Sequence, residues 1–124
     1  MPSEQPDIIV TDRPLERAEL VRLLQRYFGD LVKYVVDLHT GRVAVGGELH
    51  ADAEALLLES GSAQQDLWAA NYYPGRGPEA CIEYTALINI RPAQGNPGME
   101  IADPAIRERL RELTFEVLGR GEAL

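Results

Sequence analysis

The most suggestive chemistry in this 124-residue chain lies in one short segment, residues 46–52. It reads Gly-Gly-Glu-Leu-His-Ala-Asp, with Glu48 and His50 two positions apart. A carboxylate beside an imidazole is a common pairing for general acid–base catalysis. In an extended chain the two side chains share one strand face about 6.5 Å apart, which suits a shared water, ligand or metal better than a direct hydrogen bond. The alternative is a glycine bend that ends a strand, with both side chains in solvent.

A second polar cluster follows an apolar run near residue 90. Strand parity puts Asn89 and Arg91 on the face opposite that apolar run. Gln94 and Asn96 come next, in a loop fixed by glycine and proline. Loops held by a rigid strand often carry binding residues, so these four and Asp52 are candidate ligand-binding residues. An equally good reading is a strand-to-helix connection whose amides bond to local backbone groups.

Neither a metal nor a phosphate site is expected near His50. Zinc usually takes three or four ligands, but the second histidine, His39, falls in a predicted hairpin turn. Glu48, His50 and Asp52 match no recognised ligand spacing. A phosphate at the start of the following helix would be repelled by Asp52 and Glu54. We therefore expect no metal and no other cofactor.

The elements that carry these residues can be predicted from periodicity and from capping residues. Strands are expected at residues 7–10, 32–36, 42–49, 67–73 and 81–90, the last being the clearest alternating pattern. Helices are expected at residues 12–28, 51–60 and 104–118. Asp12 and Asp103 are the expected N-caps, with Pro104 in the first helical position. Ser62 and Gln65 have capping-box spacing and predict one further helical turn.

This order, β-α-β-β-α-β-β-α, predicts an α+β fold. Consecutive hairpins favour a mixed or largely antiparallel sheet, with helices packed mainly on one face. No internal linker interrupts the chain, so residues 1–124 are expected to form a single domain with an ordered core at about 8–119.

The charge composition limits the classes of partner that the chain is expected to bind. The chain has 20 acidic and 12 basic residues, for a net charge of −8, and the basic residues are dispersed. We expect no nucleic-acid binding and no attachment to an anionic membrane, because both need clustered positive charge. No secretory leader opens the chain, and the single cysteine, Cys81, fits a reducing compartment, so a cytoplasmic location is expected.

Three strings resemble a small bacterial family known only as a domain of unknown function. They are residues 46–54 (GGELHADAE), residues 66–68 (DLW) and residues 88–96 (INIRPAQGN). The resemblance extends from about Ile8 to Gly119. In that family a serine is common where this chain has Ala86 and Ala93, which disfavours a mechanism that needs a hydroxyl there. The resemblance implies an intact single domain, and it brings no activity, cofactor or catalytic residue.

Three functions remain open. The first is a small-molecule-binding domain that forms a homodimer or larger homo-oligomer. The second is a small hydrolase-like enzyme in which His50 is the acid or base, Glu48 is its partner and Arg91 holds an anionic substrate. The third is a protein-interaction adaptor that uses an exposed sheet edge or apolar patch. Strand parity also predicts that His50 and Arg91 face solvent and contribute little to stability.

Overall fold

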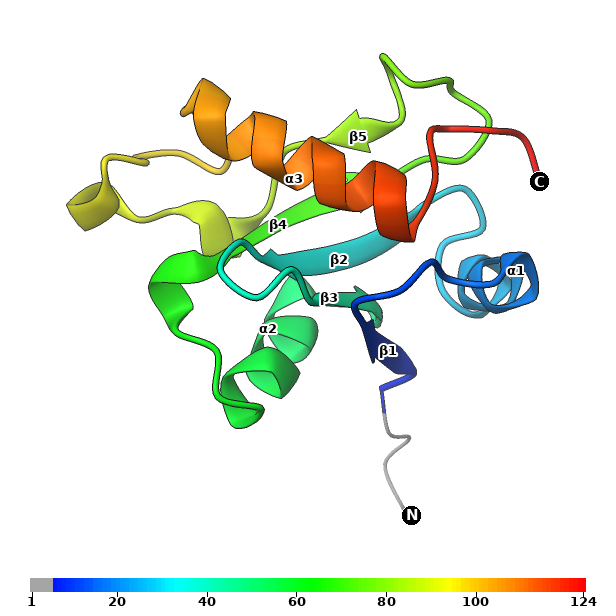
Figure 1. Ribbon diagram of the computed structural model, residues 1–124, viewed down its shortest axis with the longest axis horizontal. Coiled ribbons are helices and arrows are strands. Elements are labelled where there is room, and N and C mark those ends of the chain that lie inside the picture. Colours follow the sequence, from blue (N-terminus) through cyan, green and yellow to red (C-terminus); the bar gives the residue numbers. More distant parts are fainter. Residues whose placement is uncertain (1–5) are drawn as a thin grey trace.

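The computed structural model describes residues 6–124 and contains one open sheet of five antiparallel strands, in the order β1-β3-β2-β4-β5 (Figure 1). The strands are β1 (Ile8–Thr11), β2 (Val32–Asp37), β3 (Val43–Gly46), β4 (Leu67–Tyr72) and β5 (Ile82–Glu83). The helices are α1 (Arg17–Arg26), α2 (His50–Glu59) and α3 (Pro104–Val117). Single 3-10 turns lie at Gln64–Asp66, Leu87–Asn89 and Pro92–Gln94. The predicted α+β class, element order and antiparallel pairing are confirmed.

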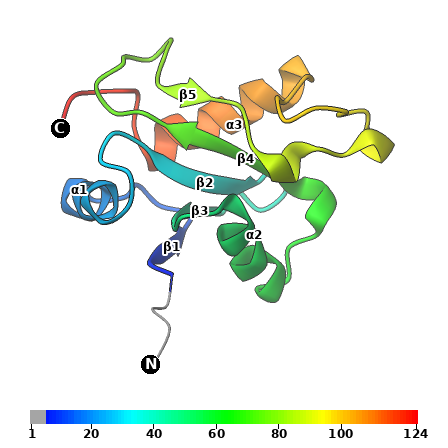
Figure 2. The ribbon, with the colours of Figure 1, turned by 180° about the vertical axis from the view of Figure 1, so that it is seen from behind.

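Helices cover both faces of the sheet. α1 and α3 pack on one face, where Leu23 and Leu110 join a core that includes Tyr34 of β2. α2 packs on the opposite face, where Leu57 meets Val35 of β2. Figures 1 and 2 show α3 in front of the sheet in one view and behind it in the other. Two of the three helices therefore share a face, and α2 covers the other one together with Ala86 and Ile88.

The predicted strand over residues 42–49 ends early, at Gly46. Gly46 has φ 116° and Gly47 has φ 83°, so the chain turns away from the sheet at these residues. A Cβ at Gly46 would lie 2.3 Å from the carbonyl oxygen of Asp7, so glycine is needed for the approach of the N-terminal strand. Gly46 thus admits another backbone, as the sequence suggested, while Gly47 lies against the Ile8 side chain. His50 becomes the first residue of α2, so helix geometry and not strand parity determines where its side chain lies.

The predicted strand over residues 81–90 is mostly irregular, and only the two residues of β5 pair with β4. The side chain of Asn89 occupies the place of the missing strand. Its Oδ1 accepts a hydrogen bond from the Ala69 N–H at 3.0 Å, and its Nδ2 donates to the Ala69 carbonyl at 2.9 Å. A neighbouring strand would use the same two backbone groups. The alternating apolar pattern in the sequence could not show that a side chain replaces a strand here.

The first helix is shorter than predicted and begins at Arg17. Thr11 Oγ1 accepts from the Arg13 N–H at 3.0 Å, which forms a turn where the helix was expected to start. The Leu15 N–H donates to the Val117 carbonyl at 2.8 Å and holds this segment against the end of α3. The expected cap at Asp12 is therefore wrong, and Glu16 is the N-cap.

The last helix begins as predicted, because Asp103 Oδ1 accepts from the Ala105 N–H at 2.8 Å. The turn expected after residue 62 also forms, at Gln64–Asp66. Its predicted cap is wrong, since Ser62 donates its hydroxyl to the buried carboxylate of Asp37 at 2.6 Å. None of the helices in the described part of the chain is long and apolar enough to cross a membrane.

Candidate functional site

His50 is a buried side chain at the first position of α2, packed against β4. Its side chain and backbone are 9% exposed, and Nε2 lies 2.9 Å from the Ala70 carbonyl oxygen. A carbonyl oxygen only accepts, so Nε2 carries the ring proton in the neutral form and Nδ1 keeps its lone pair. The expectation that His50 faces solvent is wrong, because the helix that starts there turns the imidazole toward the sheet.

Burial lowers the pKa of His50 below its ordinary value. The positive charge of Lys33 acts in the same direction. The Ala70 carbonyl, the Asn71 side chain and the charge of Glu83 oppose the change without reversing it. The imidazole is therefore neutral at pH 7, and Nδ1 is a hydrogen-bond acceptor.

A row of three polar side chains crosses the sheet beside His50. Lys33 pairs with Asn71 between β2 and β4, and Asn71 pairs with Glu83 between β4 and β5. Asn71 Nδ2 donates to Glu83 Oε1 at 2.7 Å, and the Tyr73 hydroxyl donates to the same oxygen at 3.2 Å. Asn71 Oδ1 is buried and accepts no hydrogen bond. An unpaired buried acceptor destabilises the folded state by roughly 1–3 kcal/mol, so a donor that binds this atom would relieve that cost.

A hollow of about 360 Å³ opens at this row. Its polar wall includes Lys33, His50 and Asn71. Its apolar wall is built by α2 and by the segment that Asn89 holds, and it consists of Leu49, Ala51, Ala86, Leu87, Ile88 and Met99, with Thr85 between the two walls. The rim is unusually apolar, since Leu87 is 72% exposed and Leu49 57% exposed. The arrangement is a concave apolar surface with a few convergent polar groups, which is typical of small-molecule sites.

Glu48 and Asp52 do not join this hollow. Glu48 is exposed in the bend that follows Gly47, and Asp52 is half-buried in the first turn of α2. Neither residue is among those that line the hollow. Of the segment that sequence analysis singled out, only His50 with its neighbours Leu49 and Ala51 reaches the candidate site.

Arg91 is a buried clamp, contrary to the expectation that it faces solvent. Its side chain is 9% exposed and lies over the Trp68 ring, 4.7 Å from the ring centre. Nε donates to the Ile88 carbonyl at 3.1 Å, Nη1 to the Gln64 carbonyl at 2.8 Å, and Nη2 to the Leu67 carbonyl. Each of its three nitrogens donates to the protein's own backbone, and Arg91 does not line the hollow at His50, so it is a poor anchor for a substrate anion there.

The other polar residues of the same loop also hold it together. Asn96 Nδ2 lies 2.7–3.0 Å from the carbonyl oxygens of Asn89, Gly98 and Glu100. Asn96 Oδ1 accepts from the Ala102 N–H at 2.9 Å. The exposed Gln94 reaches the Gln65 carbonyl at 3.2 Å. Of the two readings that the sequence left open, these contacts favour the structural connection.

A hollow of about 480 Å³ lies beside Arg91, between α2 and the loop. Glu54 Oε2 is buried there without a hydrogen bond, but it is 3.8 Å from Arg91 Nη2. The two charges compensate each other, so this hollow offers no free charge to a ligand.

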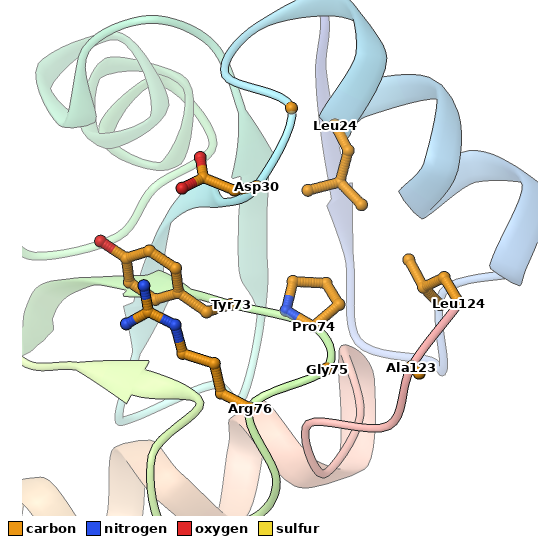
Figure 3. Close-up of a pocket in the computed structure, with 9 residues that line it drawn as sticks. Leu24, Asp30, Tyr73, Pro74, Gly75, Arg76, Ala123 and Leu124 are labelled. Carbon is orange, nitrogen blue, oxygen red and sulfur yellow. The ribbon is translucent and has the colours of Figure 1, made fainter.

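Another hollow, of about 280 Å³, lies between the end of β4 and the C-terminal residues (Figure 3). The Arg76 guanidinium stacks on the Tyr73 ring, 3.7 Å from its centre. Within residues 6–124, the buried side-chain atoms that lack a hydrogen bond belong to Glu54 and Asn71, and neither lines this hollow. The hollow at His50 is therefore the better candidate.

Sequence reasoning missed Lys33 and Asn71. Both lie inside apolar strands, where a single polar residue looks incidental, and they meet only through the pairing of β2 with β4. No local motif carries this signal. In the described part of the chain, no group of three His, Cys, Asp or Glu side chains is placed to hold a metal ion.

Comparison with known proteins gives one match. Residues 8–117 match the family described as "Protein of unknown function (DUF5674)". The chain belongs to this family. No curated protein and no solved structure matches the DUF5674 chain. The function of the domain must therefore be inferred from the site itself.

We predict that Arg91→Ala strongly destabilises this DUF5674 domain. Removing the guanidinium leaves the buried Glu54 oxygen without its opposite charge and the buried Leu67 carbonyl without its donor, which costs roughly 3–5 kcal/mol. On the usual scaling for a domain of this size, the melting temperature falls by roughly 10 °C or more. The control is Arg109→Ala, because Arg109 is exposed and forms an ion pair with Glu112 on the helix surface. A melting temperature of the Arg91 variant near that of the parent would contradict a structural role for Arg91.

We also predict that His50 makes the stability of the DUF5674 domain depend on pH. The folded-state pKa of His50 lies below the ordinary value of 6.5. As the pH falls through 6.5, the unfolded chain takes up the proton first, so the free energy of unfolding decreases until the pH passes the folded-state pKa. Denaturant titrations between pH 7.5 and 5.5 should show a smaller slope in His50→Gln than in the parent. His39→Gln, at an exposed histidine, should keep the parental slope. Equal slopes in all three proteins would refute this role.

Proposed function

We propose that this domain binds a small, largely apolar molecule in the hollow at His50. The observation that carries the proposal is the combination of an apolar wall, exposed at its rim, with a buried polar end in which Asn71 Oδ1 lacks a partner. A volume of about 360 Å³ falls within the range of small-ligand sites. Polar groups at one end orient a ligand, and the apolar wall supplies the affinity.

Binding is favoured over hydrolysis by the positions of the candidate catalytic residues. Glu48 and Arg91 both lie outside the hollow, and each nitrogen of Arg91 donates to a backbone carbonyl. His50 has its Nε2 engaged by Ala70, so one nitrogen remains for a ligand. The hydrolase hypothesis pairs His50 with the carboxylate of Glu48, and the residues that line the hollow include no carboxylate that could take its place.

The proposal predicts that apolar fragments bind the parent and that a bulky residue at the rim abolishes their binding. Ala51→Trp fills the hollow from the exposed first turn of α2. Ala55→Trp is the matched control, because Ala55 is exposed on the same helix and does not line the hollow. Ligand-observed NMR with a library of small apolar fragments should give hits that the parent and Ala55→Trp share and Ala51→Trp loses. Hits common to all three proteins, or none with the parent, would exclude the hollow as a binding site.

The proposal includes a cytoplasmic location and a homodimer or larger homo-oligomer. A reducing compartment is supported by the single cysteine, Cys81, which is fully buried.

Self-association is supported by the two outer strands, β1 and β5, which leave the sheet with open edges. We expect light scattering to report a mass above the 13.7 kDa monomer at high micromolar concentration. A monomer mass under those conditions would rule out self-association and leave the ligand site unaffected.

A further inference from the structure

The row Lys33–Asn71–Glu83 carries a gradient of charge along one face of the sheet. Its members are paired neighbours on β2, β4 and β5. Side chains at such paired positions start about 4.5–5.5 Å apart. The row therefore runs from a cation, through a neutral amide, to an anion over a short span.

The middle of the row needs a hydrogen-bond donor. Asn71 Nδ2 donates a hydrogen bond to Glu83, and Asn71 Oδ1 accepts none. Neutral His50 cannot satisfy that oxygen, because its one ring proton is held on Nε2 by the Ala70 carbonyl. A donor from a ligand would satisfy it, and the negative charge of Glu83 favours a donor that is positively charged.

The hollow also has a place for negative charge. Lys33, the only lysine of the sequence, lines it and lies close enough to His50 to lower the pKa of the imidazole. Leu49, His50 and Ala51 bring the N-terminus of the ten-residue helix α2 to the same hollow. The first N–H groups of a helix have no partner within the helix, and they favour an anion.

The acidic residues of α2 do not cancel this preference. Asp52 does not line the hollow, and Glu54 lies 3.8 Å from Arg91 on the other side of the loop. Glu83 is exposed, does not line the hollow and is tied by the hydrogen bonds from Asn71 and Tyr73.

We propose that the hollow recognises a free apolar α-amino acid. Its carboxylate faces Lys33 and the N-terminus of α2, its ammonium group donates to Asn71 Oδ1, and its side chain packs against Leu87, Ile88 and Met99. In an α-amino acid both charged groups are attached to one carbon, which suits two neighbouring side chains of a sheet. The inference rests on the proposed function and adds the class of ligand.

The test is an NMR titration of ¹⁵N-labelled protein with leucine, methionine and phenylalanine. Each is supplied as the free amino acid, as its amide without the carboxylate charge, and as its N-acetyl form without the ammonium charge. We expect the best free amino acid to bind roughly tenfold more tightly than either blocked form, as the loss of one charged hydrogen bond implies. In Lys33→Gln the preference for the free amino acid over its amide should fall several-fold, because only the N-terminus of α2 then favours the carboxylate.

Two controls isolate the effect of Lys33. Arg76→Gln removes a positive charge that stacks on Tyr73 outside the hollow, and it should keep the preference for the free amino acid. Lys33→Arg keeps the charge and should keep most of the preference.

Equal affinities for the three forms, or a preference that Lys33→Gln leaves intact, would overturn the amino-acid proposal. Suppose that no amino acid binds the parent, while apolar fragments bind the parent and fail to bind Ala51→Trp. The ligand class alone is then wrong. If neither fragments nor amino acids bind the parent, the proposed function fails as well.

Discussion

The pairing of the Asn89 side chain with the backbone of Ala69 is the interaction on which the rest of this structure depends. β5 pairs with β4 for only two residues, and beyond it the outer edge of β4 has no strand. Asn89 bonds to both polar groups of Ala69 and also donates to the Met99 carbonyl at 3.1 Å. Each such bond contributes about 0.5–1.5 kcal/mol net, and a buried backbone group left without one costs roughly 1–3 kcal/mol. This part of the β4 edge, beyond β5, is thereby satisfied without a strand.

The candidate site exists because the Asn89 side chain takes the place of a strand beside β4. A strand through residues 84–90 would lie in the plane of the sheet and bury its side chains on both faces. Held at Asn89, the segment instead turns through Leu87–Asn89 and presents Leu87 and Ile88 beside α2. Arg91 and Asn96 fix the following loop to the backbone, which steadies the wall that contains Met99. The loop residues hold the structure, and the polar end of the hollow comes from the strands and from α2.

Much of the fold could be predicted from the sequence, because it depends on local chemistry. The β2–β3 hairpin and the Asp103 cap of α3 were predicted from neighbouring residues alone. The strand over 81–90 was predicted wrongly, because an apolar alternation does not show that Asn89 can replace a neighbouring backbone. His50 was misplaced because its orientation depends on the left-handed conformations of Gly46 and Gly47. The row of Lys33, Asn71 and Glu83 exists only in the register of three strands, which no local pattern reports.

The central claim is that a ligand enters the hollow between His50 and the segment that Asn89 holds. Met99 lines this hollow, and the sequence contains only one other methionine, Met1. A protein labelled with ¹³C at the methionine methyl groups therefore reports on the hollow through a single assigned signal, with Met1 as the reference. We predict that saturating ligand shifts the Met99 methyl resonance and leaves that of Met1 unchanged. An unchanged Met99 resonance, recorded while binding is detected by another method, would contradict the account.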